Sequence, residues 1–403
     1  MRLQMSTNNF DKKRWVLLIG ALLICVTCSW KQLWSITFNP LQDIYGISVD
    51  FLNSTYSIYS LLATLLMLLA GKLVVRFGAS IMIFTGAVSY FIGMALPGIS
   101  SSPYAFAIGY IIFLSWSDQV VYVGAFDHLA KAFPDRRGIT MSAASVGISL
   151  GGMILPVLCQ GLIDKIGFTA QFWIMAMILC GVCLIGLILC PKPPEGYVPA
   201  GYKIPDPAEE EQKELEEENA RPGFVQKDWK MMLKDPAFYI YFVIAILGAM
   251  TGVMLMSQSS WMAQEIAQVT PAQGALLVSG LGLAAFIGKL FFGWLGDKIG
   301  RLNLMIIVFI IMTIVMVLLL FCEGKALYFV IVFWIGVFAS GGISSSMPAI
   351  TSDLFGTKFF ALNFAIIMCS LPIGQAIVPW VATLGLKTGS FVVTFGIEAV
   401  AGA

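Results

Sequence analysis

Eleven long apolar stretches constrain the fold of this 403-residue chain more than any other feature of its sequence. The hydrocarbon core of a bilayer is about 30 Å thick, and a helix needs about 20 apolar residues to cross it. With that length as the rule, the sequence predicts spans at residues 15–38, 52–72, 80–99, 104–127, 138–160, 168–190, 237–262, 273–294, 303–322, 326–348 and 359–383. A twelfth apolar stretch begins near residue 389 and has only 15 residues, so we expect a truncated or incomplete last span.

The composition is that of an all-α polytopic membrane protein. Charged residues make up 12% of the chain and hydrophobic residues 58%, whereas a soluble protein has about a quarter of its residues charged. The formal net charge of +1 gives no basic face for a nucleic acid, so no such partner is expected. A single histidine excludes histidine-rich metal sites, and we expect neither a metal nor a cofactor. The lipid bilayer is the expected surrounding, and a monomer the expected state.

The distribution of basic residues predicts the orientation in the membrane. Fifteen of the 24 Lys and Arg follow even-numbered spans, and only Lys165, Lys325 and Lys387 follow odd-numbered ones. Cytoplasmic loops carry the positive excess. We therefore expect a multi-pass protein of the cytoplasmic (inner) membrane with its N-terminus inside.

Two halves of the chain resemble each other. Gly71–Gly78 follows the second predicted span, and the similar stretch Gly293–Gly300 follows the eighth, 222 residues later. Phe133 and Phe355 are also 222 residues apart. The constant displacement predicts a parallel repeat of two six-helix bundles, an arrangement that places a substrate site between them near the midplane. Residues 1–190 would form the first bundle, 191–236 a polar cytoplasmic linker rich in glutamate, and 237–403 the second bundle.

The stretch that follows the eighth span carries a family resemblance. Gly293-Trp-Leu-Gly-Asp-Lys-Ile-Gly-Arg301 resembles the signature loop of the major facilitator superfamily. The resemblance implies the twelve-helix fold of two pseudo-symmetric bundles and transport by alternating access. The first-half copy departs from the pattern, because Val75 stands where the family usually has aspartate.

Several further stretches are similar to the oxalate:formate antiporter and monocarboxylate transporter branch of that superfamily. They are Trp34–Leu41, Lys131–Gly138, Pro193–Tyr197, Asp228-Trp229 and Asp353–Lys358. The chain departs from the branch at two positions. Leu371 stands where the oxalate:formate antiporters have a second basic residue, and Ala285 stands where the monocarboxylate transporters have an acidic residue. A second carboxylate of the substrate, or the proton, must then be handled by other residues.

Charged residues inside apolar spans are candidates for function, because such a charge costs about 2.5–3.5 kcal/mol on insertion scales. Lys289 in the eighth span has small neighbours at helical spacing, and it matches the basic residue that binds the substrate carboxylate in the related families. The alternative is a lysine whose ammonium reaches the interface. Lys31 in the first span, with Trp34 beside it, would be a second cationic contact, or part of an interfacial aromatic belt.

Asp118, near the middle of the fourth span, completes the charged set. Tyr122 follows it by one helical turn and is a further candidate substrate contact. Asp118 could carry a coupling proton, because burial of a carboxyl group favours its neutral form, or it could pair with one of the lysines. The resemblance implies a conformational latch at the cytoplasmic side, for which the candidates are Asp297, Arg301, Arg76, Arg136 and Arg137.

These features predict a secondary active transporter for a small organic anion, a mono- or dicarboxylate, working as an antiporter or as a proton symporter. Protons or a counter-anion would be its co-substrates. An efflux pump for an apolar compound is the alternative among transporters, given 20 Met and 29 Phe. A membrane-embedded sensor or enzyme is the alternative from another class. Against this alternative, the sequence shows no nucleophile–base pair for catalysis, and a sensor or enzyme would not explain the 222-residue repeat.

Overall fold

The computed structural model describes residues 7–100, 102–133, 137–192, 197, 226–322, 324–356, 359–388 and 396. All regular structure in these residues is helical. Eleven of the helical segments are long and apolar enough to cross a membrane, which confirms the eleven predicted spans. The twelfth predicted span lies outside the described residues, apart from Gly396.

The chain divides into two compact units. Unit 1 comprises residues 1–202, 256–283 and 322–330, and unit 2 comprises residues 203–255, 284–321 and 331–403. The helices of residues 1–202 are α1 (Thr7–Thr27), α2 (Trp34–Tyr45), α3 (Val49–Phe77), α4 (Ala79–Ile99), α5 (Pro103–Ile108), α6 (Ser115–Ala132), α7 (Arg137–Ile166) and α8 (Phe168–Leu189). The others are α10 (Trp229–Lys234), α11 (Pro236–Ser257), α12 (Ser259–Ala267), α13 (Pro271–Ile299), α14 (Arg301–Leu319), α15 (Ala326–Phe355), α16 (Phe360–Met368) and α17 (Ser370–Thr388).

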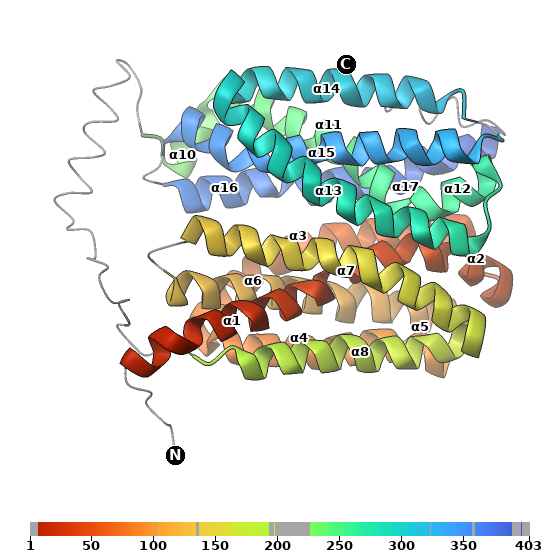
Figure 1. Cartoon of the computed structure of the whole chain (residues 1–403), viewed down its shortest axis with the longest axis horizontal. Helices are drawn as coiled ribbons and strands as arrows, with labels where there is room; N and C mark the ends of the chain where they lie inside the picture. The colour runs from red at the N-terminus through yellow and green to blue at the C-terminus, as the bar shows by residue number, and fades with distance from the viewer. Residues whose placement is uncertain are drawn as a thin grey trace. The chain divides into compact units, whose positions relative to one another are not determined.

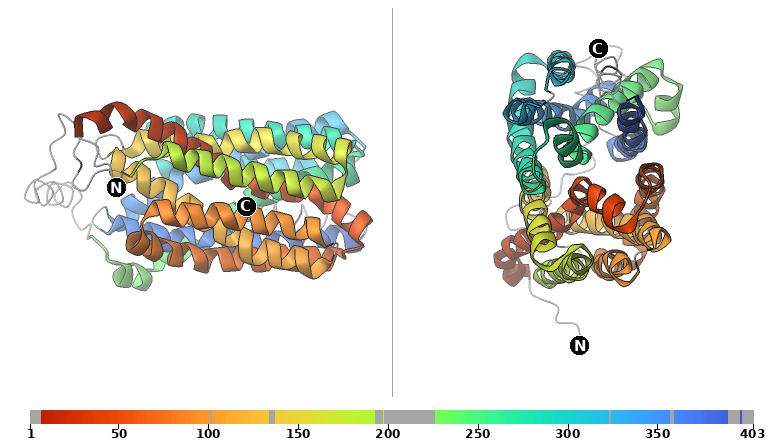
Figure 2. Two further views of the ribbon diagram at one scale, coloured as in Figure 1. Left: turned by 90° about the horizontal axis from the view of Figure 1, so that it is seen from below. Right: turned by 90° about the vertical axis from the view of Figure 1, so that its right-hand side faces the viewer.

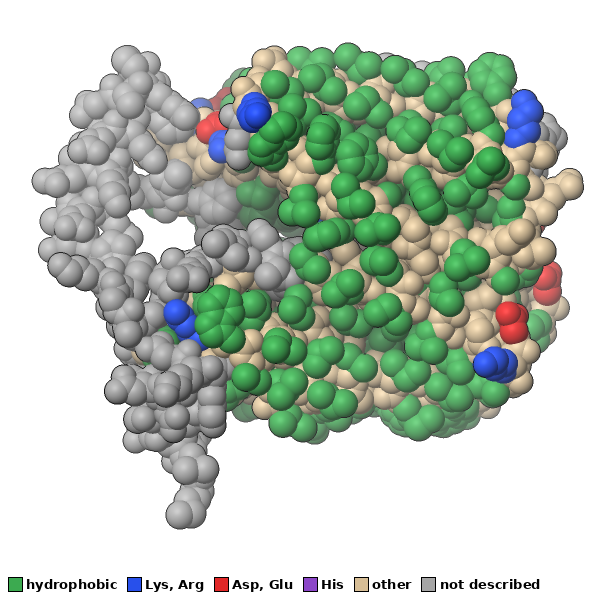
Figure 3. Space-filling view, in the orientation of Figure 1, with side chains coloured by type: hydrophobic (Ala, Val, Ile, Leu, Met, Phe, Trp, Pro, Cys, Tyr) green, Lys and Arg blue, Asp and Glu red, His purple; other side chains and the backbone are tan. Residues whose placement is uncertain are grey.

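Within unit 1, the long helices run side by side (Figures 1 and 2). α4 packs against both α6 and α8, and α1 packs against α7 and α8. Helices are the form that apolar spans must take, since a bilayer offers no partner for unpaired backbone groups. On the face shown in Figure 3, hydrophobic side chains cover the middle of the helices, and the charged side chains lie towards the helix ends.

The two copies of the repeated stretch end in the same backbone conformation. Gly78 ends α3 with φ 87° and ψ 147°, and Gly300 ends α13 with φ 86° and ψ 145°. A positive φ of this size strains residues that carry a Cβ, so glycine is favoured at both turns. This agreement supports the predicted repeat at the level of local structure, while the predicted division at 191–236 stays a prediction.

Two spans of unit 1 are irregular near their charged residues. Span 1 changes to a 3₁₀ segment over Cys28–Leu33, which contains Lys31. Span 4 contains a π-helical segment over Gly109–Leu114, and Asp118 lies in the first turn of the α-helix that follows. Mid-helix 3₁₀ and π segments are frequent at functional sites, because they turn side chains away from the regular helical face.

The cysteines are packing residues. All eight are free thiols, and only Cys180 and Cys369 are partly exposed. Helices also approach each other closely at glycines. A Cβ on Gly151 of α7 would lie 1.9 Å from Ser29 Oγ, so only glycine lets α7 approach the middle of span 1 this closely.

Candidate functional site

Lys31 and Asp118 form an ion pair inside unit 1. Lys31 Nζ lies 3.0 Å from Asp118 Oδ2. The Asp118 side chain is 4% exposed and that of Lys31 is 37% exposed, so the carboxylate lies deep and the ammonium partly reaches open space. Of the two roles predicted for Asp118, the structure therefore supplies the geometry for pairing with a lysine.

One carboxylate oxygen of Asp118, Oδ2, accepts all the hydrogen bonds that the structure describes for this side chain. Besides Lys31, Tyr59 Oη donates to Oδ2 at 3.2 Å and Gln119 Nε2 donates to it at 2.9 Å. Hydrogen bonds to an ionised carboxylate stabilise its charge. The three donors come from span 1, span 2 and span 4, so this carboxylate joins three helices of the unit.

Aromatic side chains surround the pair. Trp30 and Trp34 are each 1% exposed. The ring of Trp30 lies 5.5 Å from that of Tyr59, and the ring of Trp34 lies 5.0 Å from Tyr56 and 4.8 Å from Tyr110. Rings buried this deeply cannot form an interfacial aromatic belt, whose members lie at the headgroup level. Trp34 therefore belongs to the interior near Lys31, as the prediction of a substrate contact requires.

Two serine hydroxyls near the pair form hydrogen bonds within their own helical segments. Ser35 Oγ donates to the backbone oxygen of Gln32, and Ser115 Oγ donates to that of Ile111. Both hydroxyls are thus turned back to their own helix. The Tyr122 ring packs 4.5 Å from that of Phe126, so this predicted substrate contact lies against an apolar neighbour one turn from Asp118.

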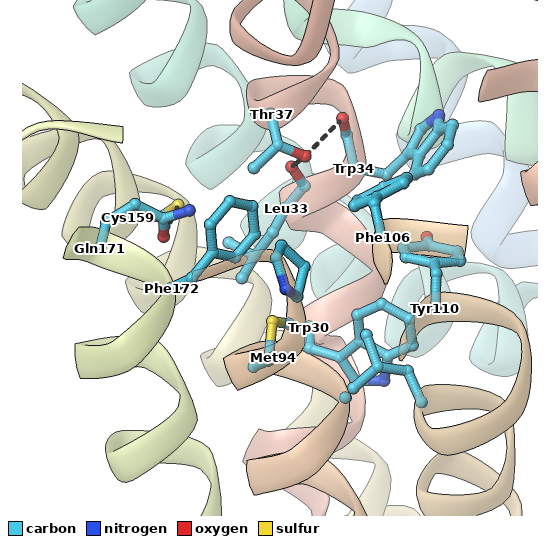
Figure 4. Close-up of a pocket in the computed structure, with 13 residues that line it drawn as sticks. Trp30, Leu33, Trp34, Thr37, Met94, Phe106, Tyr110, Cys159, Gln171 and Phe172 are labelled. Atoms are coloured by element: carbon cyan, nitrogen blue, oxygen red, sulfur yellow. Dashed lines mark hydrogen bonds between the residues drawn. The ribbon is translucent and has the colours of Figure 1, made fainter. Parts of the chain in front are cut away.

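A small cavity lies inside unit 1 next to this aromatic cluster. Trp30, Trp34 and Tyr110 line one side, and Cys159 and Gln171 line the other (Figure 4). Its volume is ≈ 20 Å³, room for about one water molecule and too little for an organic anion. Cys159 Sγ lies 3.4 Å from Gln171 Oε1, while the amide nitrogen of Gln171 has no partner among the described atoms. The cavity is therefore a site for water rather than for substrate.

Lys289 lies in unit 2, on the eighth span. The exposed apolar residues of α13 form one stripe that contains Leu283, Ile287, Leu290 and Trp294. At 100° per residue, Lys289 lies on the opposite side of the helix from the middle of this stripe. The half-buried ammonium thus shares a face with buried Ala285 rather than with the lipid-facing residues.

Lys289 also differs from Lys31 in its electrostatic surroundings. No carboxylate of the described side chains lies within 4.0 Å of its ammonium. The backbone beside it is closely packed, since a Cβ on Gly341 of α15 would come within 2.6 Å of the Lys289 backbone nitrogen. A cation inside a span without an acidic neighbour is an arrangement that favours an anionic ligand.

A second ion pair lies at the end of unit 2 where α13 turns into α14. Arg301 Nη1 lies 2.7 Å from Asp353 Oδ2 and donates to the backbone oxygen of Ala349 at 3.1 Å. Both side chains are about one-third exposed, at 35% and 37%. Arg301, a predicted latch residue, therefore connects the start of α14 to the end of α15.

Of the other predicted latch residues, the structure describes the side chain of Arg76 alone. Arg76 is exposed, and its guanidinium lies 5.2 Å from the centre of the Phe77 ring. Arg136 lies outside the described residues, and so do the side chains of Arg137 and Asp297.

Sequence reasoning missed Tyr59 and Gln119. Both are polar but uncharged, so the cost of a charge in the membrane did not mark them. The available signal was the position of Gln119 directly after Asp118. Tyr59 could be found only from the packing of α3 against α6.

Comparison with known proteins adds family relationships. The model of the Major Facilitator Superfamily matches residues 17–265 and 242–403. An uncharacterized MFS-type transporter, YhjX of Escherichia coli, is 23% identical over 373 residues, covering 92% of this chain and 88% of the relative. The oxalate:formate antiporter of Oxalobacter formigenes is 24% identical over 366 residues, covering 89% and 81%.

Two further comparisons concern one half of the chain and the fold. Human monocarboxylate transporter 6 is 27% identical over 188 residues, covering 44% of this chain and 35% of the relative. The crystal structure of a D-xylose-proton symporter superposes with a TM-score of 0.73 at 16% identity, covering 96% of this chain and 95% of that chain. At that identity the likeness concerns the fold alone.

Proposed function

Because this chain belongs to the major facilitator superfamily, we propose that it moves a small organic anion, a mono- or dicarboxylate, across the cytoplasmic membrane by alternating access. The predicted family and fold are confirmed, and membership places the chain among transporters rather than enzymes. The likeness to an oxalate:formate antiporter and a monocarboxylate transporter supports the carboxylate substrate. Antiport and proton symport are the two modes to be distinguished.

The observation that carries this proposal is the state of Lys289. Its ammonium has no carboxylate partner among the described side chains and lies away from the lipid-facing stripe of α13. The electrostatic attraction between this cation and an anion is much stronger in a partly dehydrated setting than in water. Binding a carboxylate would offset the cost of holding the lysine there unpaired.

Lys31 and Asp118 have a different part in the proposal. Since Asp118 neutralises Lys31, unit 1 offers a substrate a polar but charge-balanced surface, with Trp34 beside it. Tyr122 stays a predicted contact. Asp118 becomes a proton site only if Lys31 leaves it, which is the step that would distinguish symport from antiport. Arg301, with Asp353, is proposed as part of the latch on the cytoplasmic side, where we also place the N-terminus.

The test is uptake of labelled carboxylates into proteoliposomes by the wild type, Lys289→Ala and Lys289→Arg, matched for protein in the membrane. We expect Lys289→Ala to reduce uptake to the background of empty liposomes. Lys289→Arg should retain part of the activity with altered selectivity, because a planar guanidinium binds carboxylates in another geometry. Lys165→Ala is the control, since this exposed lysine in the last turn of α7 lies outside the predicted binding and latch residues.

Two readouts separate the modes of transport. Acceleration of uptake by an inward proton gradient indicates symport, whereas acceleration by carboxylate loaded inside the vesicles indicates antiport. Transport of every tested carboxylate by Lys289→Ala at the wild-type rate would overturn the assignment of this lysine.

A further inference from the structure

The short helix α10 lies beside the lipid-facing side of the seventh span, within unit 2. The exposed side chains at the beginning of α11 form one stripe, as the lipid-facing surface of a helix does, and its members are Tyr239, Ile240, Val243 and Ile244. The phenol of Tyr239 donates to the backbone oxygen of Leu233 at 2.9 Å, which holds α10 next to this stripe. Since α10 ends only two residues before the apolar span begins at Pro236, it lies at the level of the lipid headgroups (Figure 1).

One face of α10 is attached to the protein. Met232 is fully buried, and α10 packs against α16. The two acidic residues that flank the helix are engaged by neighbouring groups. Asp228 accepts a hydrogen bond from the backbone N–H of Met231 at 2.7 Å, and Asp235 accepts one from the Lys227 ammonium. The acidic side chains of this segment are therefore used to hold its own structure.

The opposite face of α10 carries two lysines. Lys230 and Lys234 are four residues apart, so they are neighbours on the helix, on the side opposite Met232. Both are exposed, and neither has a carboxylate within 4.0 Å among the described side chains. Trp229 and Met231 flank them and are 40% and 46% exposed. This face thus combines two cations that have no counter-ion with two apolar side chains.

We propose that the exposed face of α10 binds one anionic phospholipid. Its phosphate would pair with Lys230 and Lys234, and its acyl chains would lie along the exposed stripe of α11. Charge complementarity selects this occupant, because lysine ammonium groups bind phosphate, whereas a zwitterionic headgroup brings a cation of its own next to the two lysines. The position of Trp229 agrees with it, since tryptophan is enriched at the headgroup level.

The leaflet is the one in which the seventh span begins. The predicted orientation makes this the cytoplasmic leaflet, whose surface carries the negative potential of anionic lipids. The inference concerns a lipid and not the transported substrate, so it can fail or hold independently of the role of Lys289.

The experiment measures lipid binding to the purified full-length chain by native mass spectrometry. Dissociation constants are determined for dioleoylphosphatidylglycerol and dioleoylphosphatidylcholine, which share their acyl chains and differ in the headgroup. The wild type should bind its first phosphatidylglycerol about 30-fold more tightly than phosphatidylcholine, because each lysine near the anionic headgroup contributes about 5-fold. Lys230→Gln/Lys234→Gln should lower this ratio by about 30-fold, and each single variant should lower it by about 5-fold.

Three further variants separate charge at α10 from other effects. Lys230→Arg/Lys234→Arg keeps both cations and should keep the preference. Lys72→Gln/Lys165→Gln removes the same charge from two exposed lysines of unit 1 and should also keep it. Trp229→Ala should weaken the binding of both lipids alike, because an apolar contact does not distinguish the headgroups.

The preference is a ratio taken within each variant, so differences in the amount of folded protein cancel. Equal affinity of the wild type for the two lipids would overturn the inference, and so would a preference that survives the loss of both lysines of α10. A preference that falls equally in Lys72→Gln/Lys165→Gln would mean that net charge attracts the lipid, and the site at α10 would be overturned.

Discussion

The two units hold their membrane-embedded charges in opposite ways. In unit 1, Lys31 is paired with the carboxylate of Asp118, which also accepts hydrogen bonds from Tyr59 and Gln119. In unit 2, Lys289 has no carboxylate partner among the described side chains. At the displacement of the repeat, Lys31 corresponds to Val253 and Lys289 to Met67. The charges are thus absent from the corresponding positions of the other half.

The helix ends show the reverse arrangement. Unit 2 has the Arg301–Asp353 pair across the ends of two helices. The corresponding residues of unit 1 are Ala79 and Lys131, and Lys131 is paired within its own helix with Asp127, at 2.6 Å. Unit 1 therefore joins its helices by charge in the membrane interior, and unit 2 joins them by charge at the surface.

The comparison teaches that the repeat preserves the backbone rather than the chemistry. Gly78 and Gly300 keep one conformation in both copies, because that turn tolerates few residues with a Cβ. The charged residues obey no such constraint. In unit 1 a lysine and an aspartate pair with each other, and in unit 2 Lys289 has no carboxylate partner among the described side chains. Stability should then depend most on the unit 1 pair, and anion transport most on Lys289.

The largest expected effect on stability comes from breaking the unit 1 pair. Asp118→Asn leaves Lys31 without its counter-ion, and Lys31→Met leaves Asp118 without its cation. Breaking a buried pair costs about 3–5 kcal/mol, and we expect the lower end because Lys31 is 37% exposed. The double variant should recover most of the loss, since neither charge is then left unpaired.

The free energy of unfolding can be followed by SDS titration with a thiol-reactive dye, because six of the eight cysteines are buried until the chain unfolds. Lys289→Met is the control from the other unit and should cost little or increase stability. Single variants of the pair that are no less stable than Lys289→Met would contradict the contrast between the units.

An intermediate effect is expected at the unit 2 surface pair. Arg301→Gln removes the contacts to Asp353 and to the Ala349 carbonyl. Since both side chains are about one-third exposed, solvent screening limits the loss to about 1 kcal/mol. Arg76→Gln in unit 1 is the control, because the described contact of Arg76 is with a neighbouring ring. If Arg301→Gln and Arg76→Gln lose equal free energy of unfolding, the helix ends of the two units do not differ in their dependence on charge.

The sequence predicts the spans well and the pairing of charges poorly, for a physical reason. A span is a local property, since 20 apolar residues satisfy the length of the bilayer wherever they occur. The prediction for Asp118 left a proton site and a lysine partner open, because 87 positions separate Lys31 from Asp118 and only tertiary packing brings them together. Tyr59 was missed because an uncharged tyrosine in a span carries no signal until its hydrogen bond to Asp118 is known.

The smallest expected effect concerns a further charge pair, Lys227–Asp235, outside the spans of unit 2. Lys227 donates to Asp235 Oδ2, and the Ala237 backbone N–H donates to Oδ1 at 2.9 Å, just where α11 begins. The hydrogen bond from Lys227 and then that from Ala237 lower the pKa of Asp235 below its ordinary value of 3.8. A carboxyl group with a lowered pKa stabilises the fold fully above its unfolded-state pKa, and the contribution is lost as pH falls through the folded-state value.

The difference in stability between the wild type and Asp235→Asn should accordingly be constant from neutral pH down to about pH 5 and shrink below the ordinary value of 3.8. Because solvent screens a pair at the surface, we expect a plateau of about 0.5 kcal/mol or less. Lys227→Gln should remove most of the plateau, since the lysine is the larger cause of the lowered pKa. The measurement is SDS unfolding of the three proteins between pH 3 and 7. A difference that grows as the pH falls would mean that Asp235 is destabilised in the folded state, and would remove this pair from the surface charges that hold unit 2 together.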